Sequence, residues 1–96
     1  MKLSKLEIED RLKSLNGWLY DVERDAIVKN FKFKNFRDAI AFVLKVAFES
    51  EKMNHHPDIL IEYNRVHLAL RTHSESGVTE KDFDLAYKID EFDFKF

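Results

Sequence analysis

Residues 35–53 have the sequence NFRDAIAFVLKVAFESEKM, in which apolar residues recur at helical spacing. Asn35 is a residue type favoured at a helix N-cap, so a helix is predicted over residues 36–53. A helix that is apolar around much of its circumference is covered on several sides. We therefore expect this one to contact more than one sheet, and we consider a second subunit as one of its contacts. One apolar stripe contains Phe36, Ile40, Val43 and Ala47. Further apolar residues outside that stripe are Phe42, Leu44, Val46 and Phe48.

Two segments that precede this helix have the composition of strands. Residues 18–20 suit a short strand, and residues 26–33 suit a second one after a short turn. In the second segment Ile27, Phe31 and Phe33 share one face, and polar residues occupy the other. The two segments are therefore predicted to form a hairpin with one face exposed to water.

Two more strands are predicted after the helix, over residues 59–61 and 66–72, around a tight turn at Tyr63 and Asn64. Because side chains alternate along a strand, one face of the second strand is apolar and is expected in the core. This face contains Val66, Leu68 and Leu70. The opposite face contains Arg65, His67, Ala69, Arg71 and His73.

Helices are also predicted near both ends of the chain. Ser4 followed by Glu7, and Thr79 followed by Asp82, have the spacing of a capping box, which opens a helix. The Asn-Gly pair at residues 16–17 is expected to end the first helix. The apolar positions of the first helix are Leu3, Leu6, Ile8, Leu12 and Leu15, and those of the last are Phe83, Ala86, Tyr87 and Ile89.

The predicted order is helix, strand, strand, helix, strand, strand, helix, with no structure assigned to residues 91–96. This order favours an α+β fold, in which a four-stranded antiparallel sheet has helices packed on one face. The chain has 96 residues and no linker rich in Ser, Gly or Pro. Residues 1–96 are therefore expected to form a single domain.

Composition and charge narrow the classes of function. Sixteen basic and eighteen acidic side chains are interspersed and leave a formal charge of -2, so we expect no direct binding to nucleic acid or to a membrane surface. The absence of cysteine excludes disulfides, thiolate metal sites and a cysteine nucleophile. Residues 1–10 have no apolar segment typical of a signal peptide, which predicts a cytoplasmic protein.

The end of the long helix concentrates residues that suit acid-base chemistry. Glu51 and His55 are four residues apart, so on a continuing helix the carboxylate would orient the imidazole. Pro57 cannot donate a backbone hydrogen bond and disfavours a helical His56, so the helix is expected to end there. The two adjacent imidazoles should then leave the chain in different directions.

Two more elements end in residues of the same kind. His73 follows Thr72 at the end of a strand, and Asp82 in the first turn of the last helix could hold His73 in one tautomer. Histidine can donate or accept a proton near neutral pH, because its unperturbed pKa is about 6.5. A set of imidazoles around one cavity would suit the removal of a hydroxyl beside a ring nitrogen.

Four motifs occur in order along this chain: E-x-x-x-H-H-P, a Tyr six residues after the Pro, V-x-L-x-L-x-T-H, and G-V-T-x-x-D. Together they resemble the pterin-4a-carbinolamine dehydratase family. The resemblance extends upstream through Trp18 and the segments at residues 31–33 and 36, and so covers nearly the whole chain. The matching residues are Glu51, His55, His56, Pro57, Tyr63, Val66, Leu68, Leu70, Thr72, His73, Gly77, Val78, Thr79 and Asp82.

The resemblance implies an activity and a set of site residues. It implies a hydro-lyase that dehydrates 4a-hydroxytetrahydropterin to quinonoid dihydropterin, in recycling of the tetrahydropterin cofactor, without a metal or nucleotide cofactor of its own. The implied catalytic residues are His55, His56 and His73. Glu51 and Asp82 would support them, and the implied pterin contacts are Pro57, Thr72, Ser74 and Glu75.

Several alternatives stay open at this point. The His pair alone could be a polar helix terminus interacting with the last carbonyl groups. Zinc binding by His55, His56 and His73 is a weaker alternative, because adjacent histidines rarely both reach one ion. Animal members of the family also act as dimerisation cofactors, so a non-catalytic binding module is the rival function. Two positions depart from animal members: Ile59 replaces an aromatic residue, and the loop after His73 lacks a cysteine.

Overall fold

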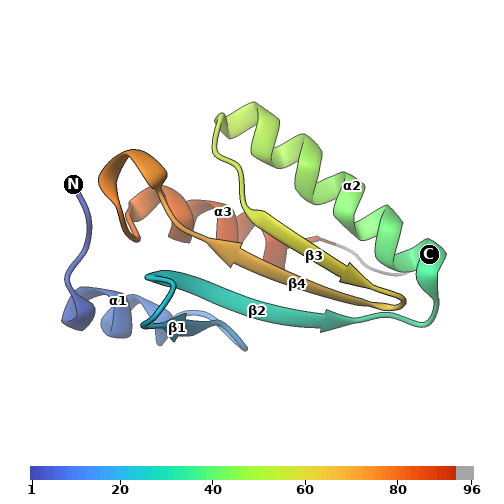
Figure 1. The fold of residues 1–96 in the computed structure, drawn as a ribbon, viewed down its shortest axis with the longest axis horizontal. Helices are drawn as coiled ribbons and strands as arrows, with labels where there is room; N and C mark the ends of the chain where they lie inside the picture. The colour runs from blue at the N-terminus through green and yellow to red at the C-terminus, as the bar shows by residue number, and fades with distance from the viewer. Residues whose placement is uncertain (93–96) are drawn as a thin grey trace.

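The computed structural model describes residues 1–92, and the predicted order of elements is confirmed. Residues 93–96, part of the tail to which no structure was assigned, lie outside the described residues. Figure 1 shows α2 on the β3 side of the sheet and α1 on the β1 side. The elements are α1 (Lys5–Leu12), β1 (Leu19–Asp21), β2 (Ala26–Lys32), α2 (Phe36–Met53), β3 (Asp58–Glu62), β4 (Arg65–Leu70), a 3-10 turn η1 (His73–Glu75) and α3 (Glu80–Asp90).

The four strands form one antiparallel sheet in the order β1-β2-β4-β3. β4 is central, and the alternation predicted for it is confirmed, because Val66, Leu68 and Leu70 are fully buried. Ile27 of β2 pairs with Leu70 and faces the same core. Buried residues of all three helices join these side chains in one cluster, so the α+β fold with helices on one face is confirmed.

The predicted capping residues open their helices as expected. At α1 the Ser4 side chain accepts from the Glu7 N–H, and the Glu7 carboxylate accepts from the Ser4 N–H, which holds the pKa of Glu7 below its usual range. Asn35 caps α2 by accepting from the Asp38 N–H at 2.8 Å. The first helix ends at Leu12, before the predicted stop at residues 16–17, because the next turns close with the tighter bonds of a 3-10 helix.

The apolar stripe that the sequence pattern of α2 picks out is not its most buried face. The fully buried stripe is Ala39, Phe42, Val46 and Ser50, one step around the helix from the predicted one. Phe42 decides this orientation, because its ring packs 4.6 Å from Phe31 and 5.0 Å from Phe33 between ring centroids. Both stripes have the helical period, so only contact with the sheet could choose between them.

Two of the apolar positions that the sequence pattern picks out in the other helices are exposed. Leu6 is exposed, since the short helix α1 turns only Ile8 fully into the core. Tyr87 is exposed at 39%, while Leu85, which was not predicted, is fully buried together with Asp82 and Ile89 at helical spacing. These errors concern which face of a helix is covered and leave the elements unchanged.

The last predicted strand is shorter than expected. β4 ends at Leu70, and Thr72 instead forms an isolated bridge with Gly77, with a backbone bond of 2.8 Å. The sequence pattern placed His73 on one face of this strand. In the structure His73 lies in η1 instead. The loop that this bridge closes brings His73 toward the end of α2 and the start of α3.

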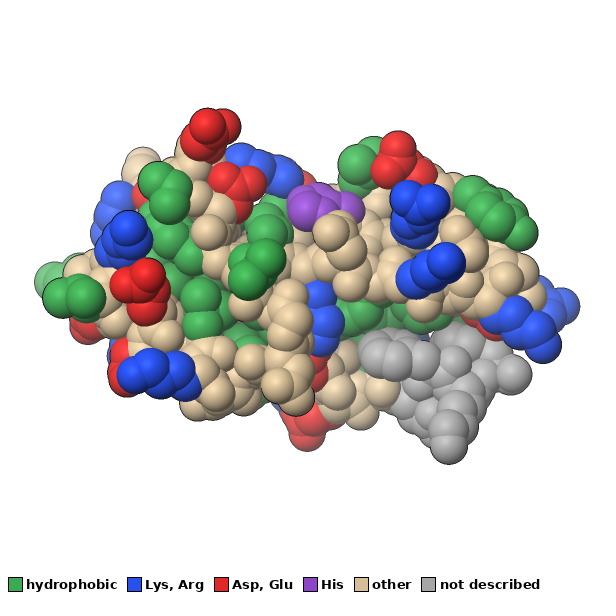
Figure 2. Space-filling model, turned by 90° about the horizontal axis from the view of Figure 1, so that it is seen from below, with side chains coloured by type: hydrophobic (Ala, Val, Ile, Leu, Met, Phe, Trp, Pro, Cys, Tyr) green, Lys and Arg blue, Asp and Glu red, His purple; other side chains and the backbone are tan. Residues whose placement is uncertain are grey.

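The surface is mixed in charge, as the composition predicted. Figure 2 shows one face on which Lys and Arg side chains are interspersed with Asp and Glu side chains and with small apolar areas. Within residues 1–92, no helix is both long enough and apolar enough to span a bilayer.

Candidate active site

A left-handed residue ends α2 and directs the following histidine into the protein. Asn54 has φ 50° and ψ 45°, a conformation that asparagine tolerates better than most residues. Its N–H donates to Glu51 O at 3.1 Å, and the His55 N–H donates to Ser50 O at 3.0 Å. This pair of bonds is a Schellman motif, which satisfies the last carbonyl groups and reverses the chain. His55 is buried as a result.

A buried carboxylate binds His55. His55 Nε2 lies 2.5 Å from Asp82 Oδ1, and Asp82 is fully buried. Asp82 Oδ2 accepts from the Thr72 hydroxyl at 2.9 Å and from the Thr79 N–H at 2.8 Å. The prediction that Asp82 holds His73 was wrong, because the carboxylate at the third position of α3 turns back toward the cap and the end of α2.

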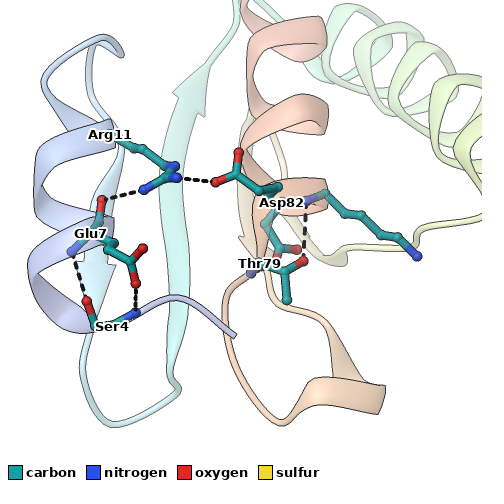
Figure 3. A network of polar contacts seen from close by, with 7 residues as sticks. Ser4, Glu7, Arg11, Thr79 and Asp82 are labelled. Atoms are coloured by element: carbon teal, nitrogen blue, oxygen red, sulfur yellow. Dashed lines mark hydrogen bonds and ion pairs between the residues drawn. The ribbon is translucent and has the colours of Figure 1, made fainter. Parts of the chain in front are cut away.

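The same cap connects α3 to α1. Figure 3 shows the capping boxes of both helices side by side, with Arg11 reaching from α1 to the first turn of α3. Arg11 pairs there with Glu80 at 2.5 Å. The helix start that carries Asp82 is therefore held by its own cap, by the Thr72 segment and by α1.

The second histidine has a different environment. His56 Nε2 lies 2.6 Å from Glu51 Oε1, and both side chains are exposed. The predicted contact between Glu51 and His55 was wrong, since the spacing rule applies only while the helix continues. Asn54 turns His55 away and leaves His56 beside the carboxylate.

All three candidate catalytic imidazoles border one open hollow of about 320 Å³. Thr72 and Ser74 border it as well, whereas Glu75 lies at a neighbouring hollow of about 250 Å³. Pro57 directly follows His56 but lines neither hollow. The lining residues are Asn54, His55, His56, Arg71, Thr72, His73, Ser74 and Lys81.

Comparison with known proteins identifies the family. The model of the family described as pterin 4 alpha carbinolamine dehydratase matches residues 1–92. The chain belongs to this dehydratase family. The predicted enzyme class, a pterin carbinolamine hydro-lyase, is thereby confirmed.

Two relatives carry the provisional name pterin-4-alpha-carbinolamine dehydratase. The protein of Sulfolobus acidocaldarius is 53% identical over 93% of this chain and 96% of its own length. The protein of Chloroflexus aurantiacus is 52% identical over 94% and 95%.

Solved structures agree with the dehydratase fold. A crystal structure described as a transcriptional coactivator/pterin dehydratase from Brucella melitensis has a TM-score of 0.90 and 42% identity, covering 94% of this chain and 96% of that one. A pterin dehydratase-like protein, described as a RuBisCO assembly factor in the alpha-carboxysome, has a TM-score of 0.66 and 22% identity, covering 78% and 87%. The second similarity shows the fold alone.

The carboxylate contacts of this dehydratase determine how two imidazoles can act. A carboxylate accepts hydrogen bonds, so it favours the tautomer with the proton on Nε2 in both His55 and His56. Nδ1 is then the nitrogen able to accept a proton. His73 makes no side-chain hydrogen bond or ion pair with any described residue.

Across residues 1–92, no three His, Asp or Glu side chains are grouped as a metal site requires.

Two cations at the hollow were not assigned to the site from the sequence. Arg71 immediately precedes Thr72, and Lys81 immediately precedes Asp82, so both are neighbours of predicted site residues. Their positions next to motif residues were the available signal. The sequence could not show that both border the hollow, because that depends on how β4 and α3 meet.

The N-terminal segment holds the chain that follows the loop residues of the hollow. Lys2 Nζ donates to Asp25 Oδ2 at 3.0 Å and to Ser76 O at 3.3 Å, and the Leu3 N–H donates to Val78 O at 2.8 Å. The Tyr20 hydroxyl donates to Asp25 Oδ1 at 2.6 Å. This bond raises the pKa of Tyr20 to about 12 and lowers the pKa of Asp25.

Proposed function

We propose that this hollow dehydrates 4a-hydroxytetrahydropterin to quinonoid dihydropterin and water by histidine general acid-base catalysis, in recycling of a tetrahydropterin cofactor. The observation that carries the proposal is that His73 borders the same hollow as the adjacent His55 and His56, although it comes from a separate segment. Family membership supplies the reaction class. The buried and exposed carboxylates supply an orientation for two of the imidazoles.

The environments of the imidazoles suit different roles in this reaction. As the bond between C4a and the hydroxyl oxygen breaks, the oxygen gains a proton, and a ring nitrogen loses its proton to form a carbon–nitrogen double bond. A carboxylate stabilises the imidazolium that forms when a histidine accepts a proton, so His55 and His56 suit the base role. His73 has no carboxylate partner among the described residues and suits proton donation to the leaving hydroxyl.

The remaining predicted residues have placements compatible with pterin binding. Thr72 and Ser74 border the hollow, and Glu75 borders the adjoining one. Pro57 follows His56 and fixes where the chain leaves the corner. We propose Thr72, Ser74, Glu75 and Pro57 as pterin contacts, with Asp82 and Glu51 acting through the histidines that they bind.

The test uses the fourth histidine as a matched control. His73→Ala should lower kcat for loss of the 4a-hydroxypterin by about 10² to 10⁴, the usual contribution of one acid or base. His67→Ala should leave kcat unchanged, since His67 bonds Asn30 at 2.5 Å and Arg24 at 3.2 Å and does not line the hollow. Equal kcat values in wild type and His73→Ala would exclude His73 from catalysis.

One surface favours a second, non-catalytic role, namely self-association or partner binding. Phe36, Leu44 and Phe48 of α2 are 53%, 52% and 67% exposed. Exposed apolar groups on one helix are typical of a protein contact. We propose a cytoplasmic homo-oligomer, a dimer or tetramer, that packs through this surface. Sedimentation would decide it, since a monomer at every concentration contradicts the proposal.

A further inference from the structure

We infer that the hollow selects pterins whose side chain carries an anionic group, a phosphate or a carboxylate, and that Arg71 binds this group. The inference rests on the proposed function, because it assumes that the ring of a pterin occupies the space between the three imidazoles. It adds the class of substrate and a residue that determines specificity.

The first observation is an unpartnered donor on Arg71. Its Nε atom is buried and has no hydrogen-bond partner among the described residues. Leaving such a donor unsatisfied is unfavourable, so native proteins rarely do so. Arg71 also borders the hollow, directly before Thr72. Because Arg71 borders the hollow, a ligand there can accept from its guanidinium.

The carboxylate that interacts with Arg71 does not bond it. The positive charge of Arg71 contributes, after other causes, to the lowered pKa of Asp25. However, the Asp25 oxygens accept from the Tyr20 hydroxyl at 2.6 Å and from Lys2 Nζ at 3.0 Å. These bonds hold Asp25 in place beside the loop, and the guanidinium keeps its donors for another acceptor.

The second observation is the charge of the lining. Arg71 and Lys81 both border the hollow, and no Asp or Glu is among its lining residues. The ammonium of Lys81 makes no ion pair with any described residue. The two carboxylates nearby, Asp82 and Glu51, are engaged by His55 and His56. The hollow is therefore lined by two permanent cations and three imidazoles, a lining that attracts an anion.

The adjoining hollow indicates where the anionic group lies. It shares Thr72, Ser74 and Lys81 with the first hollow but also has Glu75 and Glu80 in its lining. These carboxylates would repel an anion, so the group should stay on the Arg71 side. A guanidinium can bind a phosphate or a carboxylate through two parallel hydrogen bonds. A neutral pterin ring would not need a permanent positive charge at this position.

The experiment compares a neutral ligand with its anionic counterpart. Binding of 6-hydroxymethyl-7,8-dihydropterin and of its phosphate ester is measured by calorimetry on the full chain. The ester should bind at least about tenfold more tightly at low salt, as expected for added charge-assisted bonds. This preference should decrease as salt rises and screens the charges. Equal affinities for the two ligands at low salt would overturn the inference.

Variants assign the preference to Arg71. Arg71→Gln should abolish it while changing the affinity for the neutral pterin less than twofold, and Arg71→Lys should keep part of it. Arg65→Gln is the matched control, since Arg65 is the first residue of β4, the strand that Arg71 follows, but borders a different hollow. A preference that survives Arg71→Gln, or one lost equally in Arg65→Gln, would contradict the assignment.

The readout separates this inference from the proposed function. Binding needs no turnover, so a wild-type protein that prefers the ester but does not dehydrate a 4a-hydroxytetrahydropterin, with or without a phosphate on its side chain, would contradict the function alone. A protein that dehydrates the neutral and the phosphorylated 4a-hydroxytetrahydropterin with equal kcat/KM and binds both dihydropterin ligands equally would contradict the inference alone.

Discussion

His55 and His56 are adjacent in the chain and bind carboxylates in opposite environments. His55 is buried and bonds Asp82, whose side chain is 0% exposed, whereas His56 bonds Glu51, whose side chain is 76% exposed. The first contact connects the end of α2 to the start of α3 and to Thr72. The second connects two residues of one surface corner. The comparison teaches that the His55–Asp82 pair is part of the fold, whereas the His56–Glu51 pair can change without disturbing the fold.

The largest effect is expected when the buried carboxylate is removed. Asp82→Ala leaves His55, the Thr72 hydroxyl and the Thr79 N–H without their acceptor, and should lower the free energy of unfolding by about 3 to 5 kcal/mol. Glu51→Ala, the matched surface change, should lower it by less than about 1 kcal/mol. Urea denaturation measures both. Similar losses in the two variants would remove the distinction between the pairs.

The turn that precedes the two histidines offers a smaller test. Asn54→Ala places a side chain without the compensating amide at φ 50°, which should cost about 1 to 2 kcal/mol. Asn54→Gly is the control and should be close to neutral, because glycine adopts positive φ freely. Thermal and urea unfolding check this. An Asn54→Ala protein as stable as wild type would show that the left-handed turn does not decide the path of the chain here.

The surface pair should matter for turnover rather than for stability. Glu51→Gln keeps the shape of the side chain but removes the charge that stabilises a protonated His56. Removal of an imidazole itself is expected to lower kcat by about 10² to 10⁴. Glu51→Gln should lower kcat by a smaller factor. Stopped-flow dehydration kinetics compare Glu51→Gln with His56→Ala. If Glu51→Gln were as inactive as His56→Ala, Glu51 would have to contact the substrate directly.

A third carboxylate, Asp25, is intermediate in exposure at 25% and predicts a pH effect. The pKa of Tyr20 is raised from about 10 to about 12, so the stability from its bond to Asp25 is present below pH 10 and is lost as pH rises toward 12. The pKa of Asp25 is lowered, so its contribution is lost as pH falls below its usual value of 3.8. Unfolding curves of Tyr20→Phe should lack the alkaline loss and show a smaller acid loss. Identical dependence of the free energy of unfolding on pH in wild type and Tyr20→Phe would contradict this account.

Sequence patterns predicted the elements well, because their causes are local. Both capping boxes, at Ser4 and at Thr79, join residues three apart, and no distant contact is needed to form them. The alternation in β4 identified Val66, Leu68 and Leu70 as core for the same reason. Patterns could not choose the covered face of α2, since two apolar stripes compete and Phe42 is selected by its contacts with Phe31 in β2 and with Phe33 just after it.

By itself, the sequence determined which segments are helices and strands, where they are capped and which three histidines belong to a family motif. Those properties depend on residue types and short spacings, which are already present in the unfolded chain. The tertiary structure decided which carboxylate binds which imidazole and which cations border the hollow. Asp82 meets His55 across 27 positions of sequence, and such a contact exists only after packing brings α2 and α3 together.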